Sequence, residues 1–472
     1  MKKVLILLAL LGVLAASWFW GLPAYRAQKE RKFAAQARTQ FVAGEHRKAL
    51  ISARLALASN PNNVTACEVM ADLSDLSRSP AALTWRKRLA ELNPSVSNQI
   101  MLASCALRYE QPPFPIAAQT IEALATNAAT FPQFHVVAAQ LALKQQRIPE
   151  AEKHFEEAIR IEPTNELHRL NLATVRLQSR DAAVSSAAHA ELVRLQTNAT
   201  LGNHALRALA TARAAYKDWP EALKFSAALQ QDSGATFDDR LQHLILLHTA
   251  KSPDFSRFAG ELKQRASTNA GQIFALSTRL AACGQAAETL AWLKSLPAAM
   301  QSEHSVSLAF ADTFGALKDW RAMEERLNAE GWKEQDFMRL ALLALAVRNQ
   351  NDQAVSQAHW GKAVQLALER PERLGMLSQL ARGWKWDAEV NDLLWRVTKQ
   401  FPQEKWPIQA LHADYARKRD TRGLHAIYSL LVDRGETNAL VLNNYASLSL
   451  LLATNMPRAH EFAQQVYLAA TN

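Results

Sequence analysis

The feature that most constrains this chain is a unit of two amphipathic helices at residues 134–165, FHVVAAQLALKQQRIPEAEKHFEEAIRIEPTN. Its apolar side chains recur at helical spacing in both halves. They are Val137, Ala138, Leu141 and Ala142 in the first half, and Ala151, Phe155, Ala158 and Ile159 in the second. Pro149 falls in the first turn of the second helix, where its missing N–H costs no hydrogen bond, and Pro163 ends the pair. The unit therefore predicts a helical hairpin.

The second helix of this unit resembles the tetratricopeptide repeat. That family places an Ala, an aromatic residue four positions later, an Ala three further on, and a Pro five after that. Ala151, Phe155, Ala158 and Pro163 match all four positions. The small residues let two helices approach closely, and the aromatic fills the space between neighbouring pairs. An earlier segment repeats the pattern at Gly44, Ala49, Ala56 and Pro61.

Related helix pairs continue along nearly the whole chain. Pro94 follows Pro61 by 33 residues, and the turns at Trp219, Trp320 and Trp386 are each followed by an Ala within three residues. At the family's period of ~34 residues, residues 28–472 divide into about thirteen pairs. The resemblance is strongest at 28–165, and it weakens near 96–131 and 236–270. It implies an all-α fold, an α-solenoid of antiparallel helix pairs wound as a right-handed superhelix.

Composition agrees with this fold class. The chain has 472 residues, 49% of them hydrophobic, but only 15 Gly and 3 Cys. The apolar content is sufficient for a substantial core and excludes wholesale disorder. Scarce Gly is unfavourable for phosphate-binding loops and for sheets with tight hairpins. Three Cys cannot form a disulfide framework.

The positive charge is concentrated at the N-terminus. The formal net charge is +10, but residues 1–50 hold nine basic and two acidic residues, which leaves only +3 for the remaining 422. Binding to nucleic acid needs basic residues gathered along one surface. Since most of the chain is nearly neutral, we predict no nucleic-acid partner.

Residues 1–27 form a predicted membrane segment. Residues 4–20, VLILLALLGVLAASWFW, are apolar, and no charge appears between Lys3 and Arg26, so a helix here can just cross a ~30 Å hydrocarbon layer. The alternative is a cleaved signal peptide with Ala15-Ala16-Ser17 at the cleavage site. We expect an uncleaved single-pass anchor in the inner membrane with a periplasmic body. The basic residues that follow the span favour the alternative of a cytoplasmic body.

Residues that could support catalysis or metal binding are few. The sequence contains no Gly-rich phosphate loop, no nucleophile elbow and no H-E-x-x-H motif. His243 and His248 are five residues apart and point to different faces of a helix, so we interpret them as surface or edge side chains. Cys67, Cys105 and Cys283 lie among small apolar residues and are interpreted as core packing.

Adjacent carboxylates are interpreted in the same way. Asp238 and Asp239, like Glu156 and Glu157, diverge by about 100° on a helix and are expected on a solvated face. We therefore predict no enzyme, no cofactor and no metal. An accessory or disguised lytic enzyme is the remaining enzymatic alternative.

Tryptophan is unevenly distributed. Eight of the twelve fall within 292–406, at Trp292, Trp320, Trp332, Trp360, Trp384, Trp386, Trp395 and Trp406. Packing between helix pairs is the preferred interpretation, and a stacking platform for glycan or peptidoglycan is the alternative.

The resemblance implies a scaffold for protein–protein interaction. In this family the first helices of the pairs line a concave groove that binds extended or helical peptide segments. Asn171 and Asn444 match the family's Asn position, and Arg169, His204 and Arg207 are their expected groove neighbours. Our hypothesis is a non-enzymatic, membrane-tethered scaffold for assembling envelope, secretion or polysaccharide-export machinery.

Overall fold

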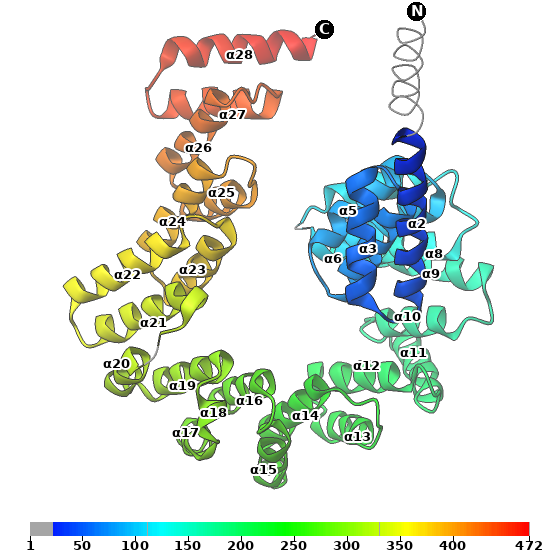
Figure 1. Cartoon of the computed structure of the whole chain (residues 1–472), viewed down its shortest axis with the longest axis vertical. Coiled ribbons are helices and arrows are strands. Elements are labelled where there is room, and N and C mark those ends of the chain that lie inside the picture. The colour runs from blue at the N-terminus through cyan, green and yellow to red at the C-terminus, as the bar shows by residue number, and fades with distance from the viewer. Residues whose placement is uncertain (1–21, 111, 330, 472) are drawn as a thin grey trace, which may run out of the picture. The chain divides into compact units, whose positions relative to one another are not determined.

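The computed structural model describes residues 22–110, 112–329 and 331–471, and these ranges contain helices and no strand (Figure 1). The chain divides into two compact units, Met1–Ala250 and Lys251–Asn472. The predicted membrane span at residues 4–20 lies outside the described residues. Within them, no helix combines the length and the apolar character that crossing a bilayer requires.

The first unit is a succession of helical hairpins ending in a single helix (Figure 1). Its helices are α2 (Leu22–Val42), α3 (His46–Ser59), α4 (Val64–Leu76), α5 (Ala81–Leu92), α6 (Val96–Tyr109), α7 (Pro115–Leu124), α8 (Pro132–Lys144), α9 (Ile148–Ile161), α10 (Glu166–Arg176), α11 (Ala182–Leu195), α12 (Gly202–Ala215), α13 (Trp219–Gln230) and α14 (Phe237–Thr249). Each even-numbered helix from α2 to α12 packs against the helix that follows it.

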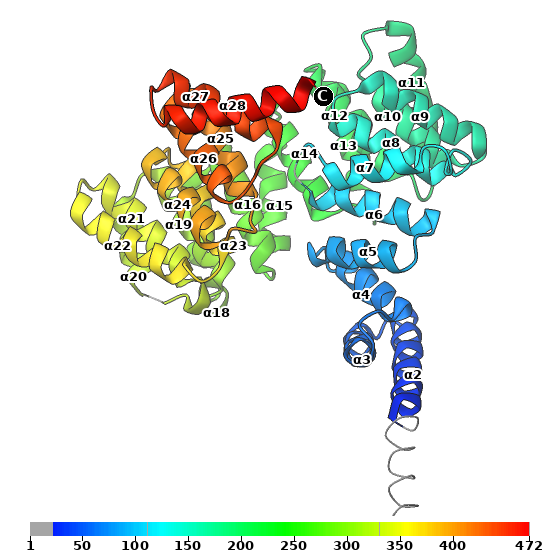
Figure 2. The ribbon, with the colours of Figure 1, turned by 90° about the horizontal axis from the view of Figure 1, so that it is seen from above.

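The second unit begins with α15 and continues as hairpins to α27 and α28, which lie side by side (Figure 2). Its helices are α15 (Phe255–Ala266), α16 (Ala270–Ala282), α17 (Ala286–Ser295), α18 (Ala298–Gln301), α19 (His304–Leu317), α20 (Trp320–Ala329), the 3-10 turn η2 (Lys333–Gln335), α21 (Asp336–Asn349), α22 (Gln353–Ala367), α23 (Pro371–Gly383), α24 (Asp387–Gln400), α25 (Trp406–Lys418), α26 (Thr421–Asp433), α27 (Ala439–Leu451) and α28 (Met456–Thr471). The single-turn helix α18 inserts between the pair α16/α17 and the pair α19/α20.

The helix pair α8/α9 shows how the repeat residues build the core. Ala151 and Ala158 are fully buried, and Phe155 is 2% exposed. Phe155 packs in one cluster with Ala142 of α8 and Leu172 of α10, which belongs to the next pair. The aromatic therefore fills the junction between neighbouring hairpins, as the tetratricopeptide resemblance predicted.

The first hairpin repeats this arrangement. Ala49 and Ala56 of α3 are fully buried and pack against Ala37 of α2 and Val69 of α4. Alanine at these positions removes side-chain bulk where two helix backbones come close, so the α2/α3 pair packs tightly along its length.

The turns between paired helices explain how the chain folds with so little glycine. Lys217, Lys318 and Lys385 adopt left-handed backbone conformations, with φ of 59°, 58° and 62°. Each follows a first helix, and the next N–H donates back to a carbonyl of the last turn, as from Trp386 to Ala381 at 2.9 Å. Glycine commonly takes this position. Here the three lysines perform the same chain reversal.

In the region 96–131, where the repeat pattern weakens, one side chain links the end of α6 to the start of α7. Glu110 follows α6 and accepts hydrogen bonds from the N–H groups of Ile116 and Ala117 in the first turn of α7. Phe114, immediately before α7, is in the left-handed conformation and 5% exposed. A carboxylate thus satisfies the free donors at the start of α7.

Candidate functional site

Within each unit, several first helices contact the first helix of the next hairpin: α2 contacts α4, α6 contacts α8 and α10 contacts α12 in the first unit, and α21 contacts α23 in the second. We call the surface that the first helices of one unit form its first-helix face. Oppositely charged residues pair between successive first helices at nearly constant sequence spacing. The pairs are Arg38–Asp72, Asp75–Arg108, Arg207–Asp239 and Arg382–Asp414, separated by 34, 33, 32 and 32 residues.

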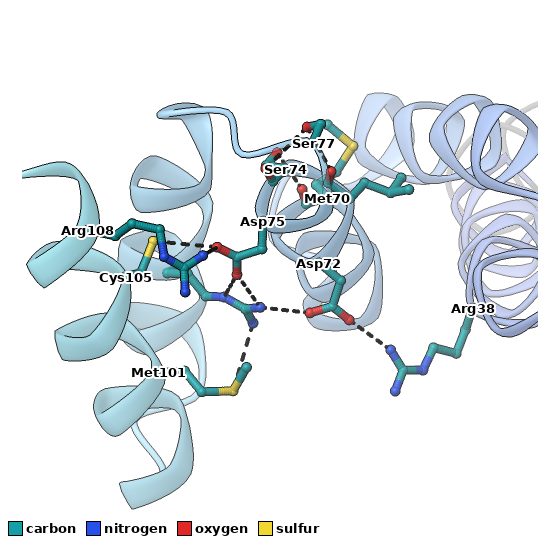
Figure 3. Close-up of polar contacts among 11 residues, drawn as sticks. Arg38, Met70, Asp72, Ser74, Asp75, Ser77, Met101, Cys105 and Arg108 are labelled. Carbon is teal, nitrogen blue, oxygen red and sulfur yellow. Dashed lines mark hydrogen bonds and ion pairs between the residues drawn. The ribbon is translucent and has the colours of Figure 1, made fainter. Parts of the chain in front are cut away.

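The N-terminal pairs join into one network across α2, α4, α5 and α6 (Figure 3). Arg86 of α5 lies at its centre and is 5% exposed. Its Nη2 donates to Asp72 Oδ1 at 2.8 Å and to Asp75 Oδ2 at 2.7 Å. Arg38 contacts the other oxygen of Asp72 at 3.1 Å, and Arg108 contacts Asp75 at 3.2 Å. The network fills the space between these helices with paired charge.

The cysteine beside this network is not a reactive thiol. Cys105 is 2% exposed, and its Sγ lies 3.9 Å from Asp75 Oδ1. Burial, assisted by the negative charge of Asp75, raises the pKa of the Cys105 thiol to about 11. Burial also raises the pKa values of Cys67 and Cys283. All three thiols are therefore protonated near neutral pH, which agrees with their interpretation as core residues.

The Arg207–Asp239 pair corrects one expectation from the sequence. Asp239 was placed on a solvated face, but it is 7% exposed and accepts from Arg207 Nε at 2.6 Å and Nη2 at 2.8 Å. It also accepts from the Thr236 hydroxyl at the start of α14. Burial acts to raise the pKa of Asp239, but the hydrogen bonds from Arg207 and Thr236 outweigh it and lower the pKa to about 2.

The expectation for His243 was also wrong. The ring is 8% exposed, and its Nδ1 lies 2.7 Å from the hydroxyl of Ser226 on α13. The helix pattern correctly separates His243 from the exposed His248, but it does not show that α13 covers the face bearing His243. Among the residues that the structure describes, no group of three or more His, Cys, Asp or Glu side chains is placed to hold a metal ion.

A groove of about 630 Å³ lies on the first-helix face between α23 and α25. Its apolar lining includes Met376, which is 46% exposed, and the half-buried Trp406. The Trp406 ring lies against the backbone of α23, 3.5 Å from where a Cβ at Gly375 would stand. Across the groove, Ala413 is a small exposed side chain that leaves space open.

A charge pair lines part of this groove. Arg382 contacts both oxygens of Asp414, at 3.1 and 3.0 Å, and Arg417 adds a third contact at 3.2 Å. Burial acts to raise the pKa of Asp414, but the hydrogen bonds from Arg382 and Arg417 outweigh it and lower the pKa below its ordinary value. The pair therefore stays ionised and holds α23 and α25 at this separation.

Two other carboxylates in the groove have no such partner. Glu372 and Glu404 line it, and neither forms an ion pair with any residue in the described ranges. A smaller cavity of about 210 Å³ adjoins the groove, sharing Arg382 and Asp414, and is also lined by Tyr415. The groove therefore combines an apolar surface, a neutralised charge pair and two unpaired negative groups.

The five predicted groove residues fall on three helices. Arg169 and Asn171 lie on α10, His204 and Arg207 on α12, and Asn444 on α27. Within the first unit α10 contacts α12, so four of the five share one part of the first-helix face. Arg207 is bound to Asp239, and Asn444 donates to the Tyr428 hydroxyl at 2.8 Å. Their role in partner binding stays a prediction.

Arg169 borders a second groove, of about 560 Å³, between α9, α10 and α11. Leu172, Val184 and Ala187 supply much of its apolar lining, with Arg176 and Glu191 also in contact with it. Arg169 donates to the Pro163 carbonyl at 2.9 Å, and its side chain is exposed. This groove is the less polar of the two.

The tryptophan-rich region is mainly packing. Trp386 is 8% exposed, and its ring contacts those of Trp360 and Trp384 at centroid distances of 5.5 and 5.0 Å. The guanidinium of Arg348 covers Trp386 at 4.2 Å, and Trp395 Nε1 donates to the Tyr415 hydroxyl. These rings are committed to internal contacts, whereas Trp406 lines the α23/α25 groove.

These hairpins, with their buried Ala and aromatic positions and their contacts through first helices, define the fold. The chain is an all-α solenoid of antiparallel helical hairpins, and its buried Ala and aromatic positions are consistent with the tetratricopeptide repeat. No protein-family model matches the sequence, and no curated protein matches it.

Comparison with solved structures gives several matches at low sequence identity. Pseudomonas aeruginosa PilF is 14% identical with a TM-score of 0.35, covering 46% of this chain and 96% of its own. Cut9–Hcn1 of the APC/C hetero-tetramer is 11% identical with a TM-score of 0.32, covering 94% of each chain. The human IFIT1 dimer with m7Gppp-AAAA is 14% identical with a TM-score of 0.28, covering 92% of this chain and 89% of its own. At these scores, the assignment of the fold rests on the hairpins themselves.

Proposed function

We propose that this chain is a non-enzymatic scaffold that binds a polypeptide segment in the groove between α23 and α25. The observation that supports this most directly is the groove's chemistry, with exposed Met376 and half-buried Trp406 beside the unpaired carboxylates Glu372 and Glu404. Such a lining suits a segment that presents an apolar side chain together with a Lys or Arg.

In this proposal residues 4–20 tether the scaffold to the inner membrane as a single-pass anchor, and the body lies in the periplasm. The scaffold assembles components of envelope, secretion or polysaccharide-export machinery. Protease digestion of the body in intact spheroplasts tests the location. Protection until the membrane is lysed would indicate a cytoplasmic body instead.

The groove is tested by photo-crosslinking in cells that express the full chain. A photoreactive phenylalanine analogue replaces Met376 in the groove, and a matched control replaces Val355, which is 41% exposed on α22. We expect crosslinks to a partner polypeptide at Met376 that disappear when Ala413→Trp fills the groove. Crosslinking that persists in Ala413→Trp would place the partner elsewhere.

Glycan binding is the second candidate, because the Trp406 ring lines the groove and aromatic rings stack on sugars. Titration of the purified full chain with a soluble peptidoglycan fragment distinguishes the two functions. Binding lost in Trp406→Ala but retained in Glu372→Gln would favour the glycan, since the polypeptide proposal requires both residues.

A further inference from the structure

The first hairpin has an unusual excess of positive charge. From the start of α2 to the end of α3 it holds eight basic and two acidic residues. Both acidic residues have partners within the molecule. Glu30 accepts from Asn60 at 2.8 Å and Asn63 at 2.7 Å, and Glu45 pairs with Lys48 at 3.0 Å. The hairpin therefore carries a formal excess of six positive charges, of which Lys48 is paired with Glu45 and Arg38 with Asp72 of α4.

Helix α3 arranges part of this charge around an exposed apolar strip. At 100° per residue, Arg47, Ile51 and Arg54 fall on one side of the helix, with Leu55 beside them. Ile51 is 54% exposed and Leu55 is 42% exposed. The buried residues of α3 face the opposite way, toward α2 and α4. We call the exposed strip, with Lys48 at its edge, the outer face of α3.

The arginines on this face have no acidic partners. Neither Arg47 nor Arg54 lies within ion-pair distance of a carboxylate in the ranges that the structure describes, and both are exposed. The outer face of α3 combines apolar side chains with unpaired guanidinium groups. It is therefore complementary to a surface that has negative groups outermost and an apolar layer beneath them. An anionic phospholipid layer has that chemistry.

The position of the hairpin in the chain supports the same partner. Helix α2 begins at Leu22, directly after the apolar run at residues 4–20. A single-stranded nucleic acid would instead be expected to stack on exposed aromatic residues, and the outer face of α3 presents aliphatic side chains. The combination of charge, apolar exposure and chain position therefore favours a membrane surface.

We propose that the outer face of α3 docks on an anionic phospholipid surface, with Ile51 and Leu55 at the level of the headgroups and Arg47, Lys48 and Arg54 against the phosphates. This contact is additional to the proposed anchor. It would hold the first hairpin flat against the bilayer and limit the directions in which the following hairpins extend.

The test uses the full chain with Leu55→Cys carrying an environment-sensitive fluorophore. The three native thiols are buried, so the label reacts at position 55. The chain is reconstituted in vesicles of phosphatidylcholine alone or mixed equally with phosphatidylglycerol. We expect a blue shift of emission only with phosphatidylglycerol, and its reversal by high salt because screening weakens the attraction.

A charge variant measures the contribution of the basic residues. Neutralising Arg47, Lys48 and Arg54 together to Gln should weaken docking roughly 100-fold, since each basic residue near an anionic surface contributes about fivefold. The matched control neutralises three exposed lysines at hairpin turns, Lys217, Lys251 and Lys318, and should leave the shift unchanged.

The outcomes separate this inference from the proposed anchor. Flotation of the vesicles in a density gradient shows whether the chain is bound to them. If the chain floats with both kinds of vesicle but its emission does not depend on the lipid, the docking is overturned and the anchor stands. Flotation with neither kind would overturn both. Single-stranded RNA, added without vesicles, provides a further test. An emission shift that is the same size in the Arg47/Lys48/Arg54 variant and in the lysine control would also contradict a membrane-specific face.

Discussion

The network around Arg86 and the groove between α23 and α25 use the same device and reach opposite results. In each, an Arg and an Asp on successive first helices pair across a spacing of 32–34 residues. Around Arg86 a third helix inserts its own guanidinium, which closes the space. Between α23 and α25, the Trp406 ring covers Gly375, and the small side chain of Ala413 leaves the groove beside it open.

This difference shows that a charge pair can either consolidate the solenoid or border a binding site. The outcome depends on the size of the neighbouring side chains. The Arg207–Asp239 pair is intermediate, with a buried carboxylate and an Arg side chain that is 32% exposed. The contacts of Arg86, the Arg207–Asp239 pair and the Arg382–Asp414 pair therefore form a series of decreasing burial, and their stability contributions should decrease in the same order.

The largest effect is expected at the buried end of the series. Arg86→Met leaves Asp72 and Asp75 close together without the group that joins them, and should lower the free energy of unfolding of the first unit by about 3–5 kcal/mol. Urea denaturation followed by hydrogen exchange in α4–α6 measures this loss. The control Arg38→Met removes a half-exposed partner and should cost less than about 1 kcal/mol. Equal losses in the two variants would contradict the comparison.

The intermediate pair has a defined pH dependence. The folded pKa of Asp239 is about 2, below its ordinary 3.8, so its ionised form stabilises the fold above about pH 4, and this contribution is lost as the pH falls toward 2. Asp239→Asn should therefore cost ~2 kcal/mol at neutral pH and progressively less below pH 4. Urea midpoints measured across this range test it. The exposed neighbour provides the control, since Asp238→Asn should show neither effect.

The smallest effect on stability is expected at the groove. Arg382 has a side chain that is 48% exposed, and Asp414 retains Arg417 when Arg382 is removed. Arg382→Gln should change the free energy of unfolding by less than about 1 kcal/mol. A loss as large as that of Arg86→Met, measured under the same conditions, would show that the pair is a core element and not the border of an open site.

The repeat residues were predictable because their role is local. The spacing of Ala151, Phe155 and Ala158 places them on one side of a helix, and all three are buried between hairpins. The three cysteines were predictable for the same reason. His243 and Asp239 were not, since the pattern of one helix does not show which neighbouring helix covers each face.

The paired charges could have been predicted from their spacing in the sequence. Arg382 and Asp414 are 32 residues apart, close to the repeat period, so a search for opposite charges at that spacing would have found them. It would not have found the groove beside them. That depends on the absence of side-chain volume at positions on two different helices.

From the amino-acid pattern alone it follows that this chain forms helices, that they pair, and which face of each repeat helix carries the small and aromatic residues. These properties depend on contacts within about 34 residues and follow from helical periodicity. It took the tertiary structure to show that Arg86 closes one junction while Ala413 leaves another open. The reason is that a cavity is the volume left by side chains from several helices, and its size depends on how closely those helices approach.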